Sequence, residues 1–298
     1  MVKRQEPRLL LLFARIAKTL PLKERPAVMS DTGPKLACYV INLPRSVARR
    51  ARMEEQLAAM ALPFTLFPAI DGRAEWDRLT PMLDAPAFRR NVGREVMAGE
   101  IGCYHAHLAV WRDFLAGTAD VALVLEDDVV FHPEFRKALD AALSVRGGWD
   151  FLKLNKIRAK QPICQGTVGS WQVNAYLGPA TGLGAYLITR DLAARLLPAM
   201  LPVTRPIDHE LDRIHVHDFR HFGLEPFPSH VDDGNESTIT GSAFSAVKKF
   251  PWYRRLPMYG LRWRNLLGKR GHLAAHGRLR ARRGPLQATG KVPPFSVQ

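Results

Sequence analysis

The chain has 298 residues, of which 47% are hydrophobic and 24% are charged, and this composition excludes a disordered, collagenous or coiled-coil protein. Three cysteines without a CxxC pair exclude a disulfide scaffold and a cysteine-rich zinc module, and they favour a reducing compartment. The net charge of +15 lies in the ends, because residues 241–298 carry a net +13, residues 1–35 a net +5 and residues 36–240 a net −3.

The first predicted element is a short amphipathic helix in a basic N-terminal extension, residues 1–35. Its apolar side chains follow helical spacing and alternate with basic ones: Leu9, Leu12, Phe13, Ile16 and Leu20 with Arg8, Arg15 and Lys18. The apolar stretch ends at Arg15, which makes it shorter than the roughly 20 residues of a membrane span and interrupts the core of a signal peptide. We therefore expect neither a membrane-spanning helix nor a signal peptide in this extension.

The body, residues 36–240, opens with a β-α-β unit. Residues 35–42 are apolar and β-rich, residues 47–61 form a helix after Ser46, and residues 63–70 form a second strand that ends in a turn. Such a unit predicts a parallel sheet with a right-handed crossover.

The rest of the body alternates between strands and helices after a polar segment, residues 73–99, which we expect to be a surface loop. Helices are predicted over 99–116, 133–143, 191–200 and 207–214, strands over 121–125, 129–131, 150–154, 184–189 and 219–228, and a hairpin within 160–180. This alternation predicts an α/β sandwich around a mostly parallel central sheet.

The last segment, residues 241–298, is a basic tail rich in aromatic residues. Its Trp and Tyr side chains alternate with arginines between residues 250 and 283, a pattern that suits an anionic membrane surface. A solvated disordered tail explains the pattern equally well, and packing of the aromatic part on the body is a further alternative. Nucleic acid is disfavoured, because no recognition motif accompanies the charge.

The strongest chemical signal is a run of three carboxylates, Glu126, Asp127 and Asp128, between two apolar stretches. Uncompensated charges at the tip of a buried strand are costly, and a hard divalent cation such as Mg²⁺ or Mn²⁺ would compensate them. Ligands of open α/β sheets bind at the carboxyl ends of strands, where this run falls. A metal there could hold a diphosphate as leaving group. The alternative is an acidic loop that caps the next helix.

Three weaker signals accompany this run. Asn42, Arg45 and Arg49 surround the start of the first helix, where an anion could bind, although a solvated helix explains them as well. Cys103 and His107 are four residues apart and could form a soft metal pair, although a structural histidine is the simpler interpretation. Asp208 begins a helix as a cap or as a general base.

Five segments in this order resemble glycosyltransferase family 25, which includes β-galactosyltransferases of bacterial lipopolysaccharide and lipooligosaccharide core synthesis. They are VINLPRSVARRARMEEQL, FPAIDGR, GEIGCYHAHLAVW, LVLEDDV and PIDHELDR. The resemblance covers roughly residues 36–240, which would make the body the glycosyltransferase domain. It implies a GT-A-like fold that binds a nucleotide sugar.

The resemblance also implies roles for individual residues. Glu126, Asp127 and Asp128 match the carboxylate motif that holds Mn²⁺ (or Mg²⁺) and the donor, with Asp127 and Asp128 toward the metal and Glu126 toward the nucleotide. Asn42, Arg45 and Arg49 would lie near the nucleotide, as would His107, which here follows Ala106 where the family has a serine. Asp208 would be the catalytic base that deprotonates the acceptor.

These implications lead to one expected function and two alternatives. The expected protein is a metal-dependent transferase that moves a hexose, expected to be galactose, from its UDP derivative to a hydroxyl of a lipid-linked saccharide, with inversion. We expect it in the cytoplasm, peripheral on the inner face of the plasma membrane through its basic ends. A metal-dependent nucleotide-sugar hydrolase or phosphoesterase could use the same carboxylates, and a non-catalytic basic membrane adaptor would need none of them.

Overall fold

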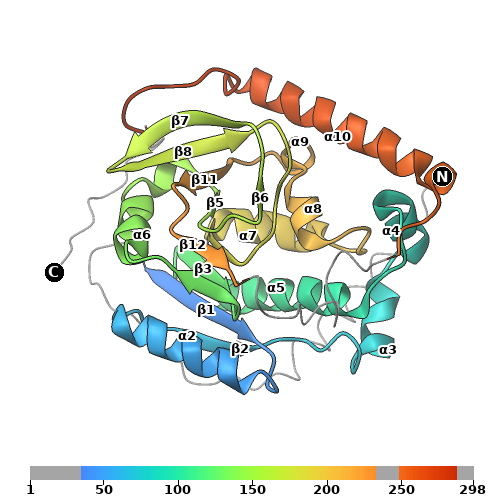
Figure 1. The fold of residues 1–298 in the computed structure, drawn as a ribbon, viewed down its shortest axis with the longest axis horizontal. Coiled ribbons are helices and arrows are strands. Elements are labelled where there is room, and N and C mark those ends of the chain that lie inside the picture. The colour runs from blue at the N-terminus through green and yellow to red at the C-terminus, as the bar shows by residue number, and fades with distance from the viewer. Residues whose placement is uncertain (1–34, 233–247, 287–298) are drawn as a thin grey trace.

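A computed structural model describes residues 35–232 and 248–286. The predicted N-terminal helix and the ends of the basic tail lie outside these residues. A single sheet of eight strands crosses the molecule in the order β2-β1-β3-β10-β5-β11-β8-β7 (Figure 1). The strands are β1 (Leu36–Asn42), β2 (Thr65–Pro68), β3 (Val121–Glu126), β5 (Phe151–Lys153), β7 (Pro162–Val168), β8 (Trp171–Tyr176), β10 (Ala185–Thr189) and β11 (His221–Glu225).

Six of the eight strands point the same way. β1 pairs in parallel with β2 and β3, and β5 pairs in parallel with β11, while β10 and β8 run against their neighbours. The predicted α/β class with a mostly parallel sheet is confirmed, and so are the parallel β-α-β opening and the hairpin, which is β7–β8. Strands with a common direction bring their carboxyl ends to one edge of the sheet.

Helices cover the sheet on both faces (Figure 1), and the central strand β3 is apolar up to its last residue, Glu126. Every residue of β3 from Val121 to Leu125 is buried, as expected for a strand covered on both sides. α2 (Val47–Ala59) and α6 (Phe135–Ser144) are neighbours, because Arg136 donates to the carbonyl of Met60. α5 (Ala98–Ala116) contacts α7 (Arg190–Leu196) and β1. Two short strand pairs lie outside the sheet: β4 (Val129–Phe131) with β12 (Ser229–Val231), and β6 (Arg158–Ala159) with β9 (Ala180–Thr181).

The segment 73–99 is not the predicted surface loop. It contains α3 (Trp76–Leu79), a 3₁₀ turn (Thr80–Met82) and α4 (Ala85–Val92). The side chain of Asp84 caps α4 by accepting a hydrogen bond from the backbone of Ala87. The prediction was wrong because Pro81 and Pro86 were taken as breakers, whereas each lies in the first turn of its helix, where proline is tolerated.

The predicted helix over 207–214 is also divided, into α8 (Ile207–Leu211) and α9 (Ile214–His217). Beyond it, residues 248–286 fold onto the body. α10 (Leu256–Ala275) contacts α4 and α9 and buries Met258, Lys269 and Leu273. Over this range the chain is therefore not a solvated tail, and Figure 1 shows α10 lying along the side of the molecule away from α2.

Candidate active site

The carboxyl ends of β1, β2 and β3 meet at one edge of the sheet and form a pocket with the first turns of α5. Three stretches of chain contribute to this pocket. They are residues 41–45 at the end of β1, residues 69–73 after β2, and residues 126–128 at the end of β3. The pocket is lined by Ile41, Leu43, Arg45, Ala69, Ile70, Asp71, Gly72, Arg73, Gly99, Cys103, Ala106, His107, Glu126, Asp127 and Asp128. The lining thus includes five of the predicted site residues.

Asn42 and Arg49 lie behind the pocket and hold Asp127. Asn42 donates to one oxygen of Asp127 at 2.7 Å and to the carbonyl of Ser46 at 3.2 Å, and Arg49 donates to the other oxygen of Asp127 at 3.2 Å. Asn42 is buried. These two residues, predicted near the nucleotide, therefore connect the start of α2 to the carboxylate run and fix the orientation of Asp127.

Asp128 has no comparable support. Its Oδ1 atom is buried and accepts no hydrogen bond from any residue in 35–232 or 248–286. Burial, followed by the charges of Glu126 and Asp127, raises the pKa of Asp128 to about 7. Burial also raises the pKa of Asp127, against the opposing effects of Asn42 and Arg49. A cation would satisfy the unpartnered oxygen and offset the repulsion, and carboxylate oxygens suit Mn²⁺ or Mg²⁺, so the donor atoms fit such an ion.

His107 belongs to a buried chain of hydrogen bonds that ends on Glu126. The indole of Trp111 donates to the hydroxyl of Tyr186 at 2.9 Å, and this hydroxyl lies 3.0 Å from Nδ1 of His107. Nε2 of His107 lies 3.2 Å from Oε1 of Glu126. Neutral His107 protonated on Nε2 satisfies every group, since Tyr186 then donates to Nδ1 and His107 donates to the carboxylate. The chain holds Glu126 at the pocket wall.

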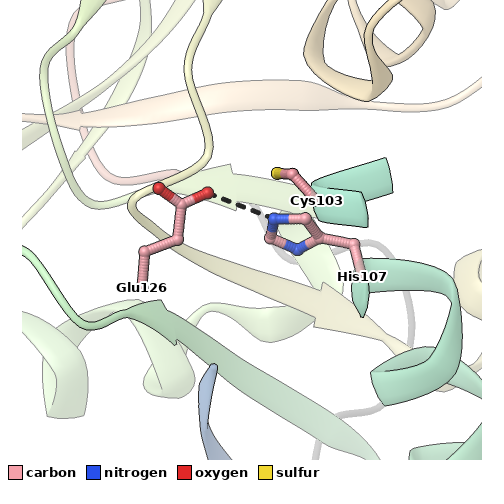
Figure 2. Close-up of side chains that lie close together, drawn as sticks. All are labelled: Cys103, His107 and Glu126. Carbon is pink, nitrogen blue, oxygen red and sulfur yellow. Dashed lines mark hydrogen bonds and ion pairs between the residues drawn. The ribbon is translucent and has the colours of Figure 1, made fainter. Parts of the chain in front are cut away.

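Cys103 joins His107 and Glu126 in a cluster whose ligand atoms all lie within 4.8 Å of one another. Figure 2 shows the three side chains pointing toward one another from α5 and from the end of β3. The predicted pair of Cys103 and His107 thus gains a third potential ligand but, among the described residues, no fourth. Burial raises the pKa of the Cys103 thiol well above its usual value, so a soft metal would first have to displace its proton.

Two glycines allow α5 to approach the pocket edge. A Cβ atom on Gly102 would lie 2.4 Å from the carbonyl oxygen of Ile70, and one on Gly72 would lie 1.8 Å from the carbonyl oxygen of Ala98. The turn after β2 and the first turns of α5 are therefore in direct backbone contact. The turn also places Asp71, which accepts from Arg45 and from the backbone of Arg73.

The base of α5 is fixed by a buried ion pair between Arg94 and Glu100, both only 7% exposed. Arg94 uses both terminal nitrogens, and the bond from Nη1 to Oε2 is 2.8 Å long. Two-pronged pairing of this kind is geometrically specific, so the ion pair sets the position of the helix that carries Cys103 and His107.

Asp208 does not line the pocket. Its two oxygens accept hydrogen bonds from the backbones of Gly182, at 3.0 Å, and His209, at 2.8 Å. The carboxylate lies close enough to Cys103 and Lys153 for its charge to act on their pKa values. The structure therefore places Asp208 beside the pocket in the first turn of α8, whose N-cap residue is Pro206.

Lys153 is a buried cation that sequence reasoning missed. It is 1% exposed at the carboxyl end of β5, and burial lowers its pKa to about 8. Nζ donates to the carbonyls of Thr181, at 3.0 Å, and Gly182. Lys153 thereby supports the loop whose backbone reaches Asp208. The signal in the sequence that could have revealed Lys153 was its place as a polar residue at the end of a predicted strand. Asp71 gave the same signal.

The sequence of this chain matches that of one protein family along most of the body. The family model described as "Glycosyltransferase family 25 (LPS biosynthesis protein)" matches residues 35–211. A "Glycosyltransferase 25 family member" of Aedes aegypti is 31% identical over 184 residues, which are 58% of this chain and 29% of that protein. "Procollagen galactosyltransferase 1-B" of Xenopus laevis is 28% identical over 239 residues, 70% of this chain and 38% of that protein.

Two further similarities are more limited. "Inactive glycosyltransferase 25 family member 3" of Mus musculus is 30% identical over 126 residues, 40% of this chain and 21% of that protein. A solved glycosyltransferase involved in the glycosylation of the major capsid of PBCV-1 matches with 11% identity and a TM-score of 0.28, over 55% of this chain and 66% of that one, which carries no argument about the site. The chain spans roughly a third of the length of the curated relatives it matches. The match over residues 35–211 shows that the chain belongs to glycosyltransferase family 25.

Proposed function

We propose that the protein transfers a hexose from its UDP derivative to a hydroxyl of a lipid-linked saccharide, with inversion at the anomeric carbon. The hexose that we propose first is galactose. The observation that carries the proposal is the pocket at the carboxyl ends of β1, β2 and β3, whose carboxylate run includes Asp128 with one buried oxygen that accepts no hydrogen bond from the described residues. Relatives named procollagen galactosyltransferases support galactose, and the family description "LPS biosynthesis protein" supports a lipid-linked acceptor.

Asp127 and Asp128 would hold a divalent cation, Mn²⁺ or Mg²⁺. Such a cation supplies positive charge against the diphosphate of the leaving group. Asn42 and Arg49 keep Asp127 oriented toward the pocket. Arg45, on the pocket wall beside Asp71, adds a guanidinium that can bind a phosphate oxygen. Glu126 is held in place by His107. In this proposal its carboxylate accepts a hydrogen bond from a hydroxyl group of the nucleotide.

Asp208 acts as the base in this proposal. Its carboxylate takes the proton of the acceptor hydroxyl while the acceptor oxygen attacks the anomeric carbon from the face opposite UDP. The bond between the anomeric carbon and the diphosphate oxygen breaks as the new bond forms, and the electron pair leaves with UDP. Gly182 keeps Asp208 in place through its backbone N–H. General-base catalysis of this type contributes about 10²–10⁴-fold to the rate.

The test is a screen of UDP-sugars with Mn²⁺ and a lipid-extract acceptor, in which galactose transfer is expected to exceed transfer of other hexoses. The Asp208→Asn variant is expected to lose about 10²–10⁴-fold in kcat and to keep its affinity for the donor, measured by calorimetry. Asp140→Asn, which changes a partly exposed carboxylate on α6 that pairs with Arg136, is the control. Wild-type turnover by folded Asp208→Asn would remove Asp208 as the base.

Two measurements separate this function from the alternatives. A hydrolase would release free galactose from the donor without an acceptor, whereas a transferase does so slowly or not at all. A non-catalytic adaptor would not bind UDP-galactose, and neutralising the carboxylates would not change its function. Absence of donor binding with Mn²⁺ present would overturn the proposal.

We extend the proposal to the membrane, with α10 as the part that docks. Large apolar side chains are exposed along one face of this helix and the turn before it, at helical spacing: Trp252, Leu256, Tyr259, Trp263 and Leu267. Arginines lie around this stripe, Arg264 and Arg270 among them. Aromatic rings and arginines together suit the headgroup region of an anionic bilayer. No helix within the described ranges has the length and apolar character of a membrane span. A peripheral place on the cytoplasmic face of the plasma membrane is part of this proposal.

Sedimentation with vesicles that contain phosphatidylglycerol tests the docking face. Trp263→Ser is expected to lower the bound fraction several-fold, because one exposed ring leaves the interface. Ile157→Ser removes an exposed apolar side chain elsewhere and is expected to bind like the wild type. Equal binding by Trp263→Ser and the wild type would overturn α10 as the docking element.

A further inference from the structure

A second cavity lies on the side of the sheet where the parallel strands begin, whereas the carboxylate pocket lies where they end. It is lined by Gly148, Gln165, Arg220, Phe222, Arg278, Arg282, Arg283, Gly284, Pro285 and Leu286. Gly148 precedes β5 and Arg220 precedes β11, so this cavity is at the amino ends of two strands that run parallel to β3. The carboxylate pocket is at the carboxyl ends of β1, β2 and β3, which point the same way as β5 and β11.

The chain after α10 builds one wall of this cavity. Gly277, with φ of +63°, ends the helix, and the backbone of Arg278 then donates to the carbonyl of Leu273 at 2.7 Å, as in a glycine-terminated helix. The chain turns back along β7, where the backbone N–H of Thr167 donates to Gly284 at 2.8 Å and that of Leu286 donates to Thr167 at 2.9 Å. The wall is therefore fixed by main-chain hydrogen bonds.

Two residues of β7 fit this wall closely. A Cβ atom on Gly166 would lie 2.7 Å from Cα of Leu286, so only glycine lets the two backbones approach this closely. The side chain of Gln165 is buried and donates to the carbonyl of Arg278 at 3.1 Å. The arginines of the segment are thus carried on a defined backbone.

The lining of this cavity contains four arginines and no acidic residue. Arg220 is paired with Asp150 at 2.6 Å, and Arg278 lies over the ring of Phe222 at 5.6 Å. Within residues 35–232 and 248–286, no carboxylate forms an ion pair with Arg278, Arg282 or Arg283. Three guanidinium groups in one cavity thus have no ion-pair partner among the described residues, although Asp150 and Asp218 lie close enough for their charges to act on the pKa of Arg278, and all three come from a segment fixed against β7.

We propose that this cavity binds a phosphate group through Arg278, Arg282 and Arg283, with Arg220 at its inner wall. Guanidinium groups match the geometry of phosphate oxygens through paired hydrogen bonds, and several of them around one cavity favour a doubly charged anion. The site is separate from the donor pocket, since the donor pocket is at the carboxyl ends of the parallel strands and this cavity is at their amino ends. The phosphate therefore comes from another ligand, either a lipid headgroup or a phosphorylated acceptor.

The direct test uses inorganic phosphate and the full chain in a chelator, so that no metal binds at the carboxylates. Calorimetry with ionic strength held constant by chloride is expected to detect binding by the wild type and by Asp128→Asn. The double variant Arg282→Gln/Arg283→Gln is expected to bind at least 10-fold more weakly. The control Arg262→Gln/Arg264→Gln removes the same charge from exposed positions on α10 and is expected to bind like the wild type.

Two further arms identify the source of the phosphate. Binding to phosphatidic acid vesicles, compared with phosphatidylcholine vesicles, tests a headgroup, and KM for a phosphorylated acceptor, compared with its dephosphorylated form, tests the acceptor. The second arm rests on the proposed transferase function, whereas the calorimetry does not, so the two can fail separately. Because Arg282 and Arg283 are exposed, the variant is expected to melt within about 2 °C of the wild type.

Two results would overturn the proposal. Equal loss of phosphate binding in the cavity variant, Arg282→Gln/Arg283→Gln, and in the control, Arg262→Gln/Arg264→Gln, would show that phosphate binding depends only on the net charge of the protein. Binding kept at the wild-type affinity in Arg282→Gln/Arg283→Gln would place the phosphate outside this cavity.

Discussion

The two cavities of this protein carry opposite charges and lie at opposite ends of the parallel set of strands, one at the carboxyl ends of β1, β2 and β3 and the other at the amino ends of β5 and β11. The carboxylate pocket gathers Glu126, Asp127 and Asp128, of which only Asp127 has an arginine partner among the described residues. The second cavity gathers four arginines, of which Arg220 has a carboxylate partner. In each cavity some charge is compensated within the protein and the rest is left over.

The difference lies in how each charge responds to its surroundings. Carboxylates in a buried pocket can take up a proton, and Asp128 does so more readily than usual because its pKa is raised to about 7. Arginines keep their charge at every pH in the physiological range. The acidic pocket therefore has two ways to lose its charge, protonation or a cation, whereas the basic cavity has one, an anion.

The largest effect is expected from Asp128→Asn. It removes one ligand charge from the carboxylate pocket, and we expect transfer to fall about 10³-fold, equivalent to about 4 kcal/mol in the barrier. The melting temperature without metal is expected to stay equal or to rise, because repulsion among the carboxylates is relieved.

Radiometric transfer assays and thermal melts with and without Mn²⁺ measure both effects, with Asp140→Asn as the control. Phosphate binding in the basic cavity should be unchanged. An Asp128→Asn protein that still gains stability from Mn²⁺ as the wild type does would take Asp128 out of the metal site.

Glu100→Gln tests whether buried charges at the base of the pocket behave differently from surface charges. The variant leaves Arg94 buried without its carboxylate partner, and we expect the free energy of unfolding to fall by about 3–5 kcal/mol. Glu95→Gln breaks an exposed pair with Arg89 and should change it by less than about 1 kcal/mol. Urea unfolding measures both, and equal effects would contradict the role given to the buried pair.

Gly102→Ala tests the backbone contact that closes the carboxylate pocket. The added methyl group would meet the carbonyl of Ile70, so we expect a loss of about 1–3 kcal/mol in stability, and weaker donor binding. Gly260→Ala, within α10, meets nothing within 4 Å and should gain about 0.5–1 kcal/mol. Chemical denaturation compares the two, and a neutral Gly102→Ala would show that α5 can move away from the turn.

The smallest effect is a pH dependence confined to the carboxylate pocket. The folded-state pKa of Asp128 is raised from 3.8 to about 7, so the folded protein binds this proton more tightly than the unfolded chain does. Its contribution to stability is complete below about pH 4 and is lost as pH rises through 7.

The measurement is the difference in melting temperature between the metal-free wild type and Asp128→Asn from pH 5 to 8. The wild type should lose stability relative to the variant across this range. The cavity variant Arg282→Gln/Arg283→Gln should show the same pH dependence as the wild type, because arginines do not titrate there. A difference between wild type and Asp128→Asn that stays constant with pH would contradict the raised pKa.

The two cavities also differ in how far the sequence reveals them. The carboxylate pocket is built from residues at the ends of strands, such as Leu43 just after β1 and Glu126 at the end of β3, and strands of common direction bring their ends together. Its supports were not predictable in the same way, since Trp111 and Tyr186 act through contacts between distant elements. The sequence indicated Asp208 as a cap or a general base, and the resemblance favoured the base, but its hydrogen bond to Gly182 depends on a loop whose path the sequence does not specify.

The basic cavity was invisible in the sequence. Its arginines come from the start of β11 and from the chain beyond α10, and their meeting depends on where α10 packs. The sequence showed basic and aromatic residues after position 241 but not which of them would face the body. Met258 and Leu273 are buried and Trp263 is exposed, although all three are apolar and belong to the same helix.

The return of the chain along β7 also has a consequence for solubility. β7 is the last strand of the sheet, and open strand edges invite pairing between copies of a chain. Residues 284–286 cover part of this edge, while the other edge strand, β2, has four residues and ends in Pro68. A truncation before Gly284 would uncover β7 and is expected to promote aggregation, whatever it does to ligands. Truncated variants of this end should therefore be tested first by light scattering, since precipitation would report an exposed strand edge and not a lost partner.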